Sequence, residues 1–264
     1  MVKLKPQIKW TIEKIEYLKK EYPLGYYKDM CEYLKISRKA LNVAAQRFKI
    51  KSEKDTNFYK LKILYNNTNI NYYWYGYIMA DGYLSVKGEL KVAISNKDYT
   101  HLEKLSLLLK SNIHIKERQT VYKKAVYCIL SCKDVIYGVK LRKKLNIIDK
   151  KTYNAPSLSF IKNKKHFLAF LAGFIDGDGH IEYYTKKTGD QTPSTIRIMC
   201  HGNWYTNLEF LQKCLDEYLN IKSTIKYSRK TYPILTIYKK DNILKLKEEF
   251  LKMKLPIMER KWKL

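Results

Sequence analysis

Two segments of the chain are copies of one motif: Trp74-Tyr-Gly-Tyr-Ile-Met-Ala-Asp81-Gly82 and Leu171-Ala-Gly-Phe-Ile-Asp-Gly-Asp178-Gly179. Both copies contain a glycine, an aromatic residue, isoleucine, a small residue, aspartate and glycine in the same register. A six-position pattern that occurs twice in one chain indicates an internal structural repeat. The apolar residues before each aspartate predict that both segments are helices that end there.

Small residues stand four apart in each copy, Gly76 with Ala80 and Gly173 with Gly177. Residues at this spacing lie on one face of a helix, and without bulky side chains they let two helix backbones approach closely. The two motif helices are therefore expected to pack against each other along this face. Each helix is followed by a glycine, Gly82 or Gly179, that suits a left-handed C-terminal cap.

The motif aspartates, Asp81 and Asp178, occupy an unfavourable place for stability. A helix C-terminus carries roughly half a negative charge and four unpaired carbonyls. Two such ends side by side also bring two carboxylates together, so a cation is expected between them. Mg²⁺ fits this site because one or two carboxylates, water and phosphate oxygens usually hold it. The alternative is two ordinary Asp-Gly turns, which would not require a duplicated apolar helix in front of them.

The similarity continues beyond the motifs. Lys133-Asp134 aligns with Lys240-Asp241, and the segment from Leu145 to Lys151 aligns with the segment from Leu255 to Lys261. Alternating strands at 89–95 and 194–200, leucine-rich helices near 102–109 and 208–215, and further strands through 122–131 and 225–238 complete each copy. We therefore predict an α+β fold with two αββαββα repeats, at residues 72–155 and 156–264.

Residues 10–51 predict three short helices. Thr11 and Ser37 are suited to cap the first and third helices, and Ala40, Leu41 and Ala44 belong to the inner stripe of the third. The outward face of the third helix carries Arg38, Lys39, Asn42, Gln46 and Arg47. The elements Trp10-Thr11, Tyr22-Pro23, Ser37–Leu41 and Ala45–Ile50 resemble the helix-turn-helix modules of the SANT/Myb-like kind. This resemblance implies that residues 1–52 place their third helix in the DNA major groove; the alternative is a helical bundle with a solvated basic face. The polar stretch at 53–71 is predicted to be a linker.

The charge of the chain restricts its partners. With 52 Lys+Arg and 25 Asp+Glu among 264 residues, the formal net charge is +27, while 45% apolar residues are enough for a folded core. Such a charge indicates a polyanionic partner, either nucleic acid or an anionic membrane surface. The longest apolar run, Phe167 to Ile175, is about half of a bilayer span. The start of the chain lacks the apolar region of a secretory signal, and the five cysteines match neither a disulfide framework nor a zinc site. Reduced thiols and a cytoplasmic location are expected, with an organelle matrix as the alternative.

From residue 72 onward, the two motifs resemble those of the single-chain, two-repeat LAGLIDADG homing endonucleases. The resemblance implies a pseudo-two-fold saddle with two antiparallel sheets in the major groove of double-stranded DNA. It implies that Asp81 and Asp178 bind Mg²⁺, or Mn²⁺ in its place, beside the carbonyls of Ala80 and Gly177. The implied activity is hydrolysis of both DNA strands across the minor groove, which bound metal ions can assist.

In this family, a lysine near the later strands and a glutamine at the end of the first long strand organise water around the scissile phosphate. The resemblance assigns the lysine role to Lys133 and Lys240, and the glutamine position to Asn96. The second copy has Gly202 at this position beside His201, and the first motif has Met79 where an acidic residue is usual. We therefore expect the two half-sites to cut at unequal rates.

The predicted strands carry basic and aromatic residues that could contact DNA, most lysines by neutralising phosphates. The candidates are Tyr83, Lys87, Lys91, Arg118, Gln119, Lys123, Tyr183, Arg197, Lys226, Arg229 and Lys230. Two alternatives share this scaffold: a non-cleaving DNA-binding regulator and an RNA maturase that helps its host intron fold. Because two copies lie in one chain, a monomer is expected. An intron, an intein and a free-standing gene all stay open as its context.

Overall fold

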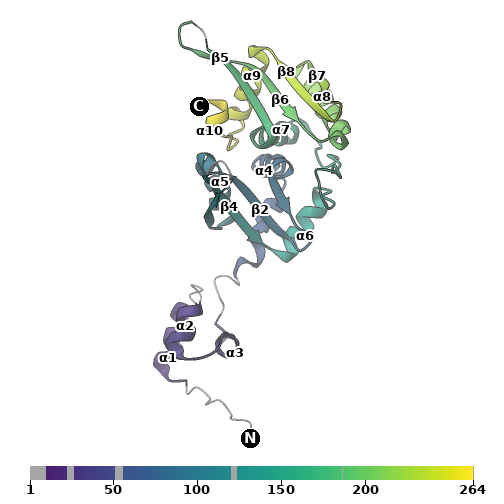
Figure 1. The fold of residues 1–264 in the computed structure, drawn as a ribbon. Helices are drawn as coiled ribbons and strands as arrows, with labels where there is room; N and C mark the ends of the chain where they lie inside the picture. Colours follow the sequence, from purple (N-terminus) through teal and green to yellow (C-terminus); the bar gives the residue numbers. More distant parts are fainter. Residues whose placement is uncertain (1–9, 23–26, 51–55, 120–123, 186, 264) are drawn as a thin grey trace. The chain divides into compact units, whose positions relative to one another are not determined.

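The computed structural model describes residues 10–22, 27–50, 56–119, 124–185 and 187–263 (Figure 1). The chain divides into two compact units, Met1–Tyr59 and Lys60–Leu264. The first unit contains α1 (Ile12–Glu21), α2 (Tyr27–Leu34) and α3 (Arg38–Arg47), the three helices that the sequence predicts.

The helices of the first unit begin as predicted. Thr11 Oγ1 accepts a hydrogen bond from the backbone N–H of Lys14, and Ser37 Oγ accepts one from Ala40. These caps satisfy N–H groups that have no partner within the helix. The buried core consists of Leu18, Tyr22, Met30, Leu34, Leu41, Ala44 and Ala45. The prediction that Ala40 belongs to the inner stripe is wrong, because its side chain is exposed in the first turn of α3.

The second unit consists of two repeats with the same order of elements. The first contains α4 (Asn69–Ala80), β1 (Gly82–Leu84), β2 (Glu89–Ser95), α5 (Tyr99–Leu109), β3 (Ile113–Gln119), β4 (Lys124–Lys133) and α6 (Val135–Lys144). The second contains α7 (Lys164–Asp178), β5 (Gly179–Thr185), β6 (Gln191–Met199), α8 (Tyr205–Leu219), β7 (Ser223–Ser228), β8 (Tyr232–Tyr238) and α9 (Lys240–Lys252). Short 3-10 helices, η2 (Asn96–Asp98) and η3 (Gly202–Trp204), precede α5 and α8, and α10 (Glu259–Trp262) follows α9. The predicted αββαββα order is confirmed in both repeats.

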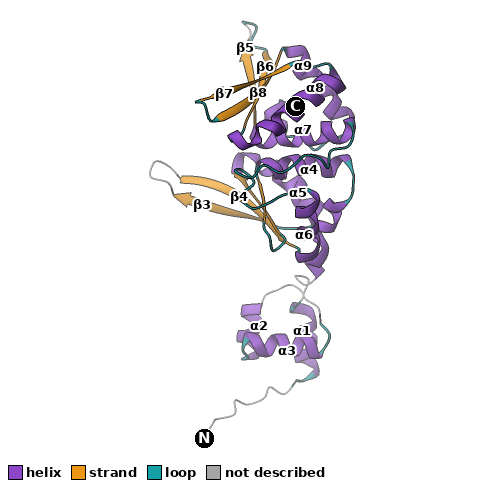
Figure 2. Cartoon of the chain, turned by 90° about the vertical axis from the view of Figure 1, so that its right-hand side faces the viewer, coloured by secondary structure: helices purple, strands orange, loops and turns teal. Residues whose placement is uncertain are grey.

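Each repeat forms one antiparallel sheet of four strands, in the orders β1-β2-β4-β3 and β5-β6-β8-β7. Along β2, exposed and buried side chains alternate, because successive side chains of a strand point to opposite faces. The buried face packs against helices, which lie on one side of both sheets (Figure 2). We call the other face the open face; Tyr83, Lys91 and Ser131 share one row of it in the first sheet.

The prediction of a linker at 53–71 is wrong for much of that range. Residues Thr56–Tyr65 form the 3-10 helix η1, and Leu61 and Leu64 are fully buried in the core of the second unit. The backbone N–H of Leu61 donates to Asp134 Oδ2 at 3.0 Å. The motif helix α4 then begins at Asn69. The stretch is polar overall, but it contains two leucines, Leu61 and Leu64, whose spacing places both side chains in the core.

Among the described residues, no helix combines the length and apolar character that crossing a bilayer requires.

Candidate active site

The motif helices α4 and α7 pack against each other at the centre of the second unit (Figure 1). A Cβ atom added to Gly173 would lie 1.8 Å from the carbonyl oxygen of Tyr73, and one added to Gly76 would lie 2.0 Å from that of Phe170. These distances are far below any van der Waals contact, so only glycine permits this approach. The predicted close packing through small residues is confirmed.

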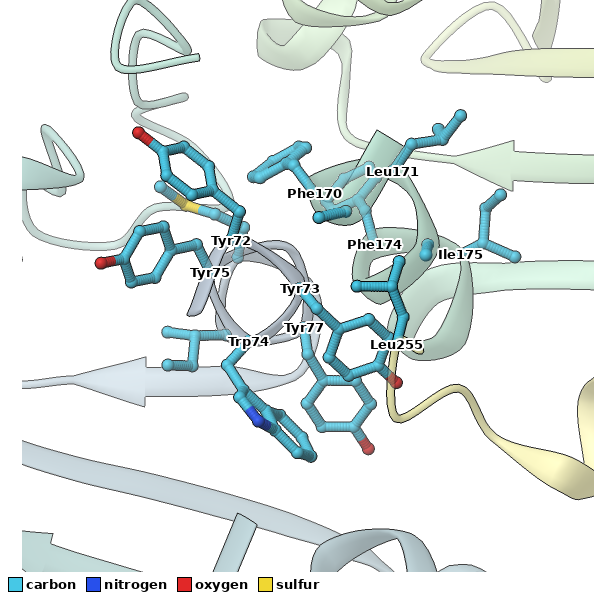
Figure 3. Close-up of a cluster of buried hydrophobic side chains, with 14 of the residues drawn as sticks. Tyr72, Tyr73, Trp74, Tyr75, Tyr77, Phe170, Leu171, Phe174, Ile175 and Leu255 are labelled. Carbon is cyan, nitrogen blue, oxygen red and sulfur yellow. The ribbon is translucent and has the colours of Figure 1, made fainter. Parts of the chain in front are cut away.

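Aromatic side chains surround the first motif helix. Tyr72, Tyr73, Trp74, Tyr75 and Tyr77 are all buried, and Figure 3 shows them projecting from α4 in different directions beside Phe170 and Phe174 of α7. A helix that is apolar on every side is expected at the centre of a protein core. The helix pair is therefore held from all sides, and its C-terminal ends are fixed in place.

The two motif aspartates lie side by side at these ends. A Cβ atom added to Gly177 would lie 2.2 Å from Ala80 Cβ and 3.5 Å from the backbone nitrogen of Asp81. Both carboxylates reach solvent, but the protein around them removes much of their hydration. This desolvation, followed by the negative charge of Asp81, raises the pKa of Asp178 to about 6. Desolvation also raises the pKa of Asp81.

The glycines after the aspartates do not form the left-handed caps that the sequence suggests. Gly179 has extended backbone angles (φ −78°, ψ 148°), and Gly82 begins β1. Glycine is required for space: a Cβ on Gly82 would lie 2.7 Å from Ile78 Cα, and one on Gly179 would lie 2.5 Å from Ile175 O. The strand thus leaves the helix by folding back across its last turn.

Two lysines that the sequence analysis did not select lie at the helix ends. Lys261 Nζ donates to the carbonyls of Ile175 (3.0 Å), Gly177 (3.0 Å) and Gly179 (2.7 Å). Lys151 Nζ donates to the carbonyl of Ala80 at 2.6 Å and to that of Met79. Each ammonium therefore compensates the negative end of one motif helix. Burial lowers the pKa of both lysines, and the nearby aspartates oppose this shift.

These groups form two matching cavities. One, of about 270 Å³, contains Asp81 and Lys261 with Ser95 and Asp98, and we call it the Asp81 cavity. The other, of about 370 Å³, contains Asp178 and Lys151 with His201, and we call it the Asp178 cavity. Each cavity combines an aspartate of one repeat with a lysine that follows the strands of the other repeat.

Both lysine segments are also held by the opposite repeat. Trp204 Nε1 of the second repeat donates to the carbonyl of Lys151 at 2.9 Å. Arg260, next to Lys261, makes two hydrogen bonds to the Asp98 carboxylate of the first repeat, at 2.6 and 2.9 Å. The end of each repeat thus crosses to its partner and completes the cavity there.

The structure does not bring Lys133 or Lys240 to the aspartates. Lys133 pairs with Glu89 at one end of the β2–β4 ladder, whereas Ser95, at the other end of β2, lines the Asp81 cavity. The two ends are six residues apart, or about 20 Å along a strand. Lys240 starts α9 beyond Tyr238, at the end of β8 opposite to Tyr232, which lines the Asp178 cavity. The structure thus places Lys151 and Lys261, and not Lys133 and Lys240, in the cavities of the aspartates.

Asn96 does not line the Asp81 cavity. Its Oδ1 accepts a hydrogen bond from the Cys128 thiol at 3.1 Å, and its neighbours Ser95 and Asp98 line the cavity instead. The predicted alignment of Asn96 with Gly202 is supported, because both begin a 3-10 helix, η2 or η3. His201 caps η3 by accepting from the N–H of Asn203 at 3.3 Å.

The described DNA-contact candidates of the first sheet lie on the open face, in a turn and at the end of a strand. Tyr83 and Lys91 are exposed and adjacent on the open face, and Lys87 is exposed in the turn between β1 and β2. Arg118 and Gln119 belong to the end of β3, whereas Lys123 lies outside the described residues.

In the second sheet, Arg197 is exposed on the open face and pairs with Glu182 at 3.0 Å. Lys226 is exposed on β7, and Arg229 and Lys230 form the turn between β7 and β8 with positive φ values of 51° and 60°. Tyr183 has a different role: its hydroxyl donates to the carbonyl of Lys261 at 3.0 Å, so it holds the C-terminal segment.

In the first unit, all five candidates on α3 are exposed. The Arg38 guanidinium lies 3.2 Å from the centre of the Tyr27 ring, and Asn42 Oδ1 accepts from the Tyr22 hydroxyl at 3.4 Å. Arg38 and Asn42 therefore also join α3 to the rest of the unit. Lys39, Gln46 and Arg47 complete the outward face.

Comparison with known proteins gives a family match within the second repeat. Residues 166–250 match the LAGLIDADG-like domain. The fold is similar to that of "The homing endonuclease I-WcaI bound to its DNA recognition sequence", with a TM-score of 0.51 and 18% identity over 72% of this chain and 84% of that chain. At this identity the similarity concerns the fold, and it agrees with the two four-stranded sheets and the central helix pair of a LAGLIDADG saddle. No curated protein sequence matches the chain.

Weaker similarities extend to two further structures. The meganuclease I-SmaMI bound to uncleaveable DNA has a TM-score of 0.46 and 16% identity over 71% of this chain and 85% of that one. Full-length DUF199/WhiA from Thermatoga maritima has a TM-score of 0.45 and 17% identity over 75% of this chain and 63% of that one.

The donor set at the helix ends fits a divalent cation. Asp81 and Asp178 supply hard oxygen ligands, and the pKa of each stays raised by desolvation although Lys151 and Lys261 lower it, so the two lysines do not fully compensate their charge. The carbonyls of Ala80 and Gly177 each accept a lysine hydrogen bond, although a carbonyl oxygen has a second lone pair. No cluster of three acidic, histidine or cysteine ligands occurs in the described part of the chain. Water and phosphate oxygens would have to complete the coordination, as is usual for Mg²⁺.

Proposed function

We propose that the chain is a site-specific DNA endonuclease that hydrolyses both strands of a long, asymmetric double-stranded target. The observation that carries this proposal is the pair of cavities at the dyad, each with one motif aspartate and one buried lysine. Two equivalent sites about a pseudo-two-fold axis suit two antiparallel DNA strands. The similarity to the DNA-bound fold of I-WcaI supports the same interpretation.

The charge of the chain supports DNA as the substrate. A net charge of +27 provides phosphate neutralisation far beyond what folding needs. Lys91 and Arg197 lie on the open faces of their sheets, and a two-stranded or larger β-ribbon fits the major groove. Lys133, which is exposed on the same face as Lys91, is proposed to contact DNA phosphates. The outward face of α3 is proposed to contact DNA beside the main target.

The residues of each cavity have distinct tasks in this proposal. Asp81 and Asp178 would hold the metal ions, and Mg²⁺ or Mn²⁺, when bound, supplies Lewis acidity to a phosphate ester and makes nearby water more acidic. Lys151 and Lys261 keep the aspartates ionised by placing positive charge beside them. Lys151 uses two of its three N–H donors on carbonyls, and the third is proposed to donate to a phosphate oxygen or a water molecule.

The decisive experiment selects the target first and tests cleavage second. Randomised duplex DNA is bound to the protein in Ca²⁺, and bound sequences are recovered, cloned and sequenced. A plasmid with the selected site is then incubated with Mg²⁺ and either wild-type protein or Asp178→Asn. We expect metal-dependent linear product with the wild type alone.

Each of the other possible outcomes would lead to a different conclusion about the function. Specific binding without any cleavage would contradict the nuclease and identify a DNA-binding regulator on the same scaffold. Preference for structured intron RNA over every selected duplex would identify a maturase. Cleavage that survives in Asp178→Asn at the wild-type rate would show that the aspartate pair is not the site.

A further inference from the structure

Asp176, two residues before the second motif aspartate, is a buried carboxylate with a complete set of partners. Its side chain is 1% exposed. Oδ2 accepts from the Tyr73 hydroxyl at 2.6 Å and from the Met258 backbone N–H at 2.8 Å. Oδ1 accepts from Trp262 Nε1 at 2.7 Å. Three donors converge on one carboxylate, and burying it without them would be strongly unfavourable.

Two of the three donors lie on either side of Lys261. Met258 precedes it by three residues and Trp262 follows it directly, so Asp176 holds the C-terminal segment at two points around the lysine. Lys261 in turn places all three of its N–H donors on carbonyls at the end of α7. The position of this ammonium beside Asp81 therefore depends on Asp176, a residue that also lines the Asp81 cavity and whose carboxylate oxygens are occupied by the three donors.

The first repeat has no equivalent support. Met79 stands at the position of Asp176 in the first motif and has no carboxylate to offer. The segment that carries Lys151 is held by Trp204, which donates directly to the carbonyl of Lys151. The two lysines thus reach equivalent places through unlike contacts.

We infer that Asp176 is a positioning residue that fixes Lys261 in the Asp81 cavity, and that its loss impairs one of the two proposed cleavage sites selectively. The role of Asp176 as a tether rests on the contacts alone, whereas the effect on cleavage rests on the proposed function. The inference distinguishes Asp176 from a general core residue, because a loss of global stability would affect both sites alike.

The first test measures the position of Lys261 without any DNA. Purified full-length protein is briefly acetylated, and the labelling rate of each lysine is read by mass spectrometry. In Asp176→Asn, the amide presents an N–H to one of the three donors, so the segment should detach. We expect Lys261 labelling to rise at least about tenfold, a population change equivalent to about 1.4 kcal/mol, while Lys151 labelling stays unchanged.

Two further variants keep the test informative if Asp176→Asn folds poorly. Trp262→Phe removes one tether without adding an amide, so it should raise Lys261 labelling even if Asp176→Asn folds poorly. Asp134→Asn is the matched control, since Asp134 is also 1% exposed and accepts from the backbone N–H groups of Leu61 and Tyr137. It should lower the melting temperature without exposing Lys261. Equal Lys261 labelling in wild type, Asp176→Asn and Trp262→Phe would overturn the inference.

The second test resolves the two DNA strands. A duplex with the selected site is labelled differently on each strand, and Lys261→Ala and Lys151→Ala define which strand each cavity cuts. Asp176→Asn should slow the strand that Lys261→Ala slows, by at least about tenfold relative to the other strand, and Asp134→Asn should leave the strand ratio unchanged. Equal slowing of both strands by Asp176→Asn would contradict selective positioning. If wild-type protein cuts neither strand, the proposed nuclease fails, and the labelling result alone decides the role of Asp176.

Discussion

Replacing Gly173 by alanine should destabilise the second unit more than any surface substitution. The added Cβ would lie 1.8 Å from the Tyr73 carbonyl oxygen, whereas an ordinary contact needs about 3.4 Å. The helices α4 and α7 would have to separate by more than an ångström, because the obstacle is backbone. A radial gap of 0.5–1 Å already removes about a quarter to a half of the dispersion energy of a contact, and the aromatic side chains of Figure 3 would lose contacts together. We therefore expect a loss at the upper end of overpacking costs, about 3 kcal/mol.

This loss of stability can be measured by urea unfolding. The signal is the fluorescence of three tryptophans that are buried in the second unit, Trp74, Trp204 and Trp262. In a unit of this size, about 3 kcal/mol corresponds to a fall in melting temperature of about 6–12 °C. Gly189→Ala is the control, because its Cβ meets nothing within 4 Å although its φ is +87°. It reports the cost of an unsuitable backbone conformation alone. Equal effects of the two substitutions would show that the close helix approach does not stabilise the fold.

Further predictions concern the candidate active site and the surfaces proposed to contact DNA. Lys151→Ala should slow cleavage of one DNA strand by about 100-fold, the usual effect of losing a charged donor at a reacting group; Lys133→Ala should only weaken binding and reduce the salt slope by about 0.9, as salt titrations of binding will show. Without divalent metal, Asp178→Asn should melt higher than wild type at pH 7, and this advantage should shrink as the pH falls from about 6 to about 4. The folded pKa of Asp178 is raised, so the folded state binds more protons than the unfolded state between about pH 4 and 6, and wild-type stability increases there as the pH falls. Arg47→Ala should weaken DNA binding on every sequence, because the first unit is proposed to contact phosphates through α3; unchanged affinity at low salt would exclude this contact.

The sequence was sufficient to predict the repeat architecture because local patterns decide it. Alternation over Glu89–Ser95 gives a strand with the predicted bounds, and the small residues at Gly76 and Gly173 specify the helix pair. These features depend on neighbours within a few residues or on a motif that occurs twice. The strand and the helix pair can therefore be predicted from the sequence without knowing which residues pack against them.

Other features depend on contacts that no local pattern contains. Leu61 and Leu64 lie in a polar stretch and gain their place from Asp134 and the core around α4, far along the chain. Gly82 resembles a helix cap in sequence, but the backbone of Ile78 is what excludes a side chain there. Both errors arose because a local interpretation was available and the long-range contact was not visible.

The lysines are a further case in which local sequence patterns do not determine which residues reach the site. The repeat alignment matches Lys133 with Lys240 and also Lys151 with Lys261, so alignment alone cannot choose between the pairs. The strand register decides, because Lys133 lies opposite Glu89, four residues or about 13 Å along β2 from Ala93, the nearest residue of β2 that lines the Asp81 cavity. Lys151 follows α6, and Lys261 lies in the short helix α10 that follows α9, so both belong to segments in which the chain returns to the ends of the motif helices.

The division of each cavity between the repeats explains why the two copies must act together. Asp81 lies beside Lys261, and Asp178 beside Lys151, so a single repeat contains an aspartate but lacks the lysine of its own cavity. The lysine of the same repeat compensates the helix C-terminus, but the lysine that lines the cavity of each aspartate arrives only when the other repeat docks. Close approach through Gly76 and Gly173 is therefore a condition for the proposed chemistry as well as for the fold, since separating the helices would also separate each aspartate from the lysine of its cavity.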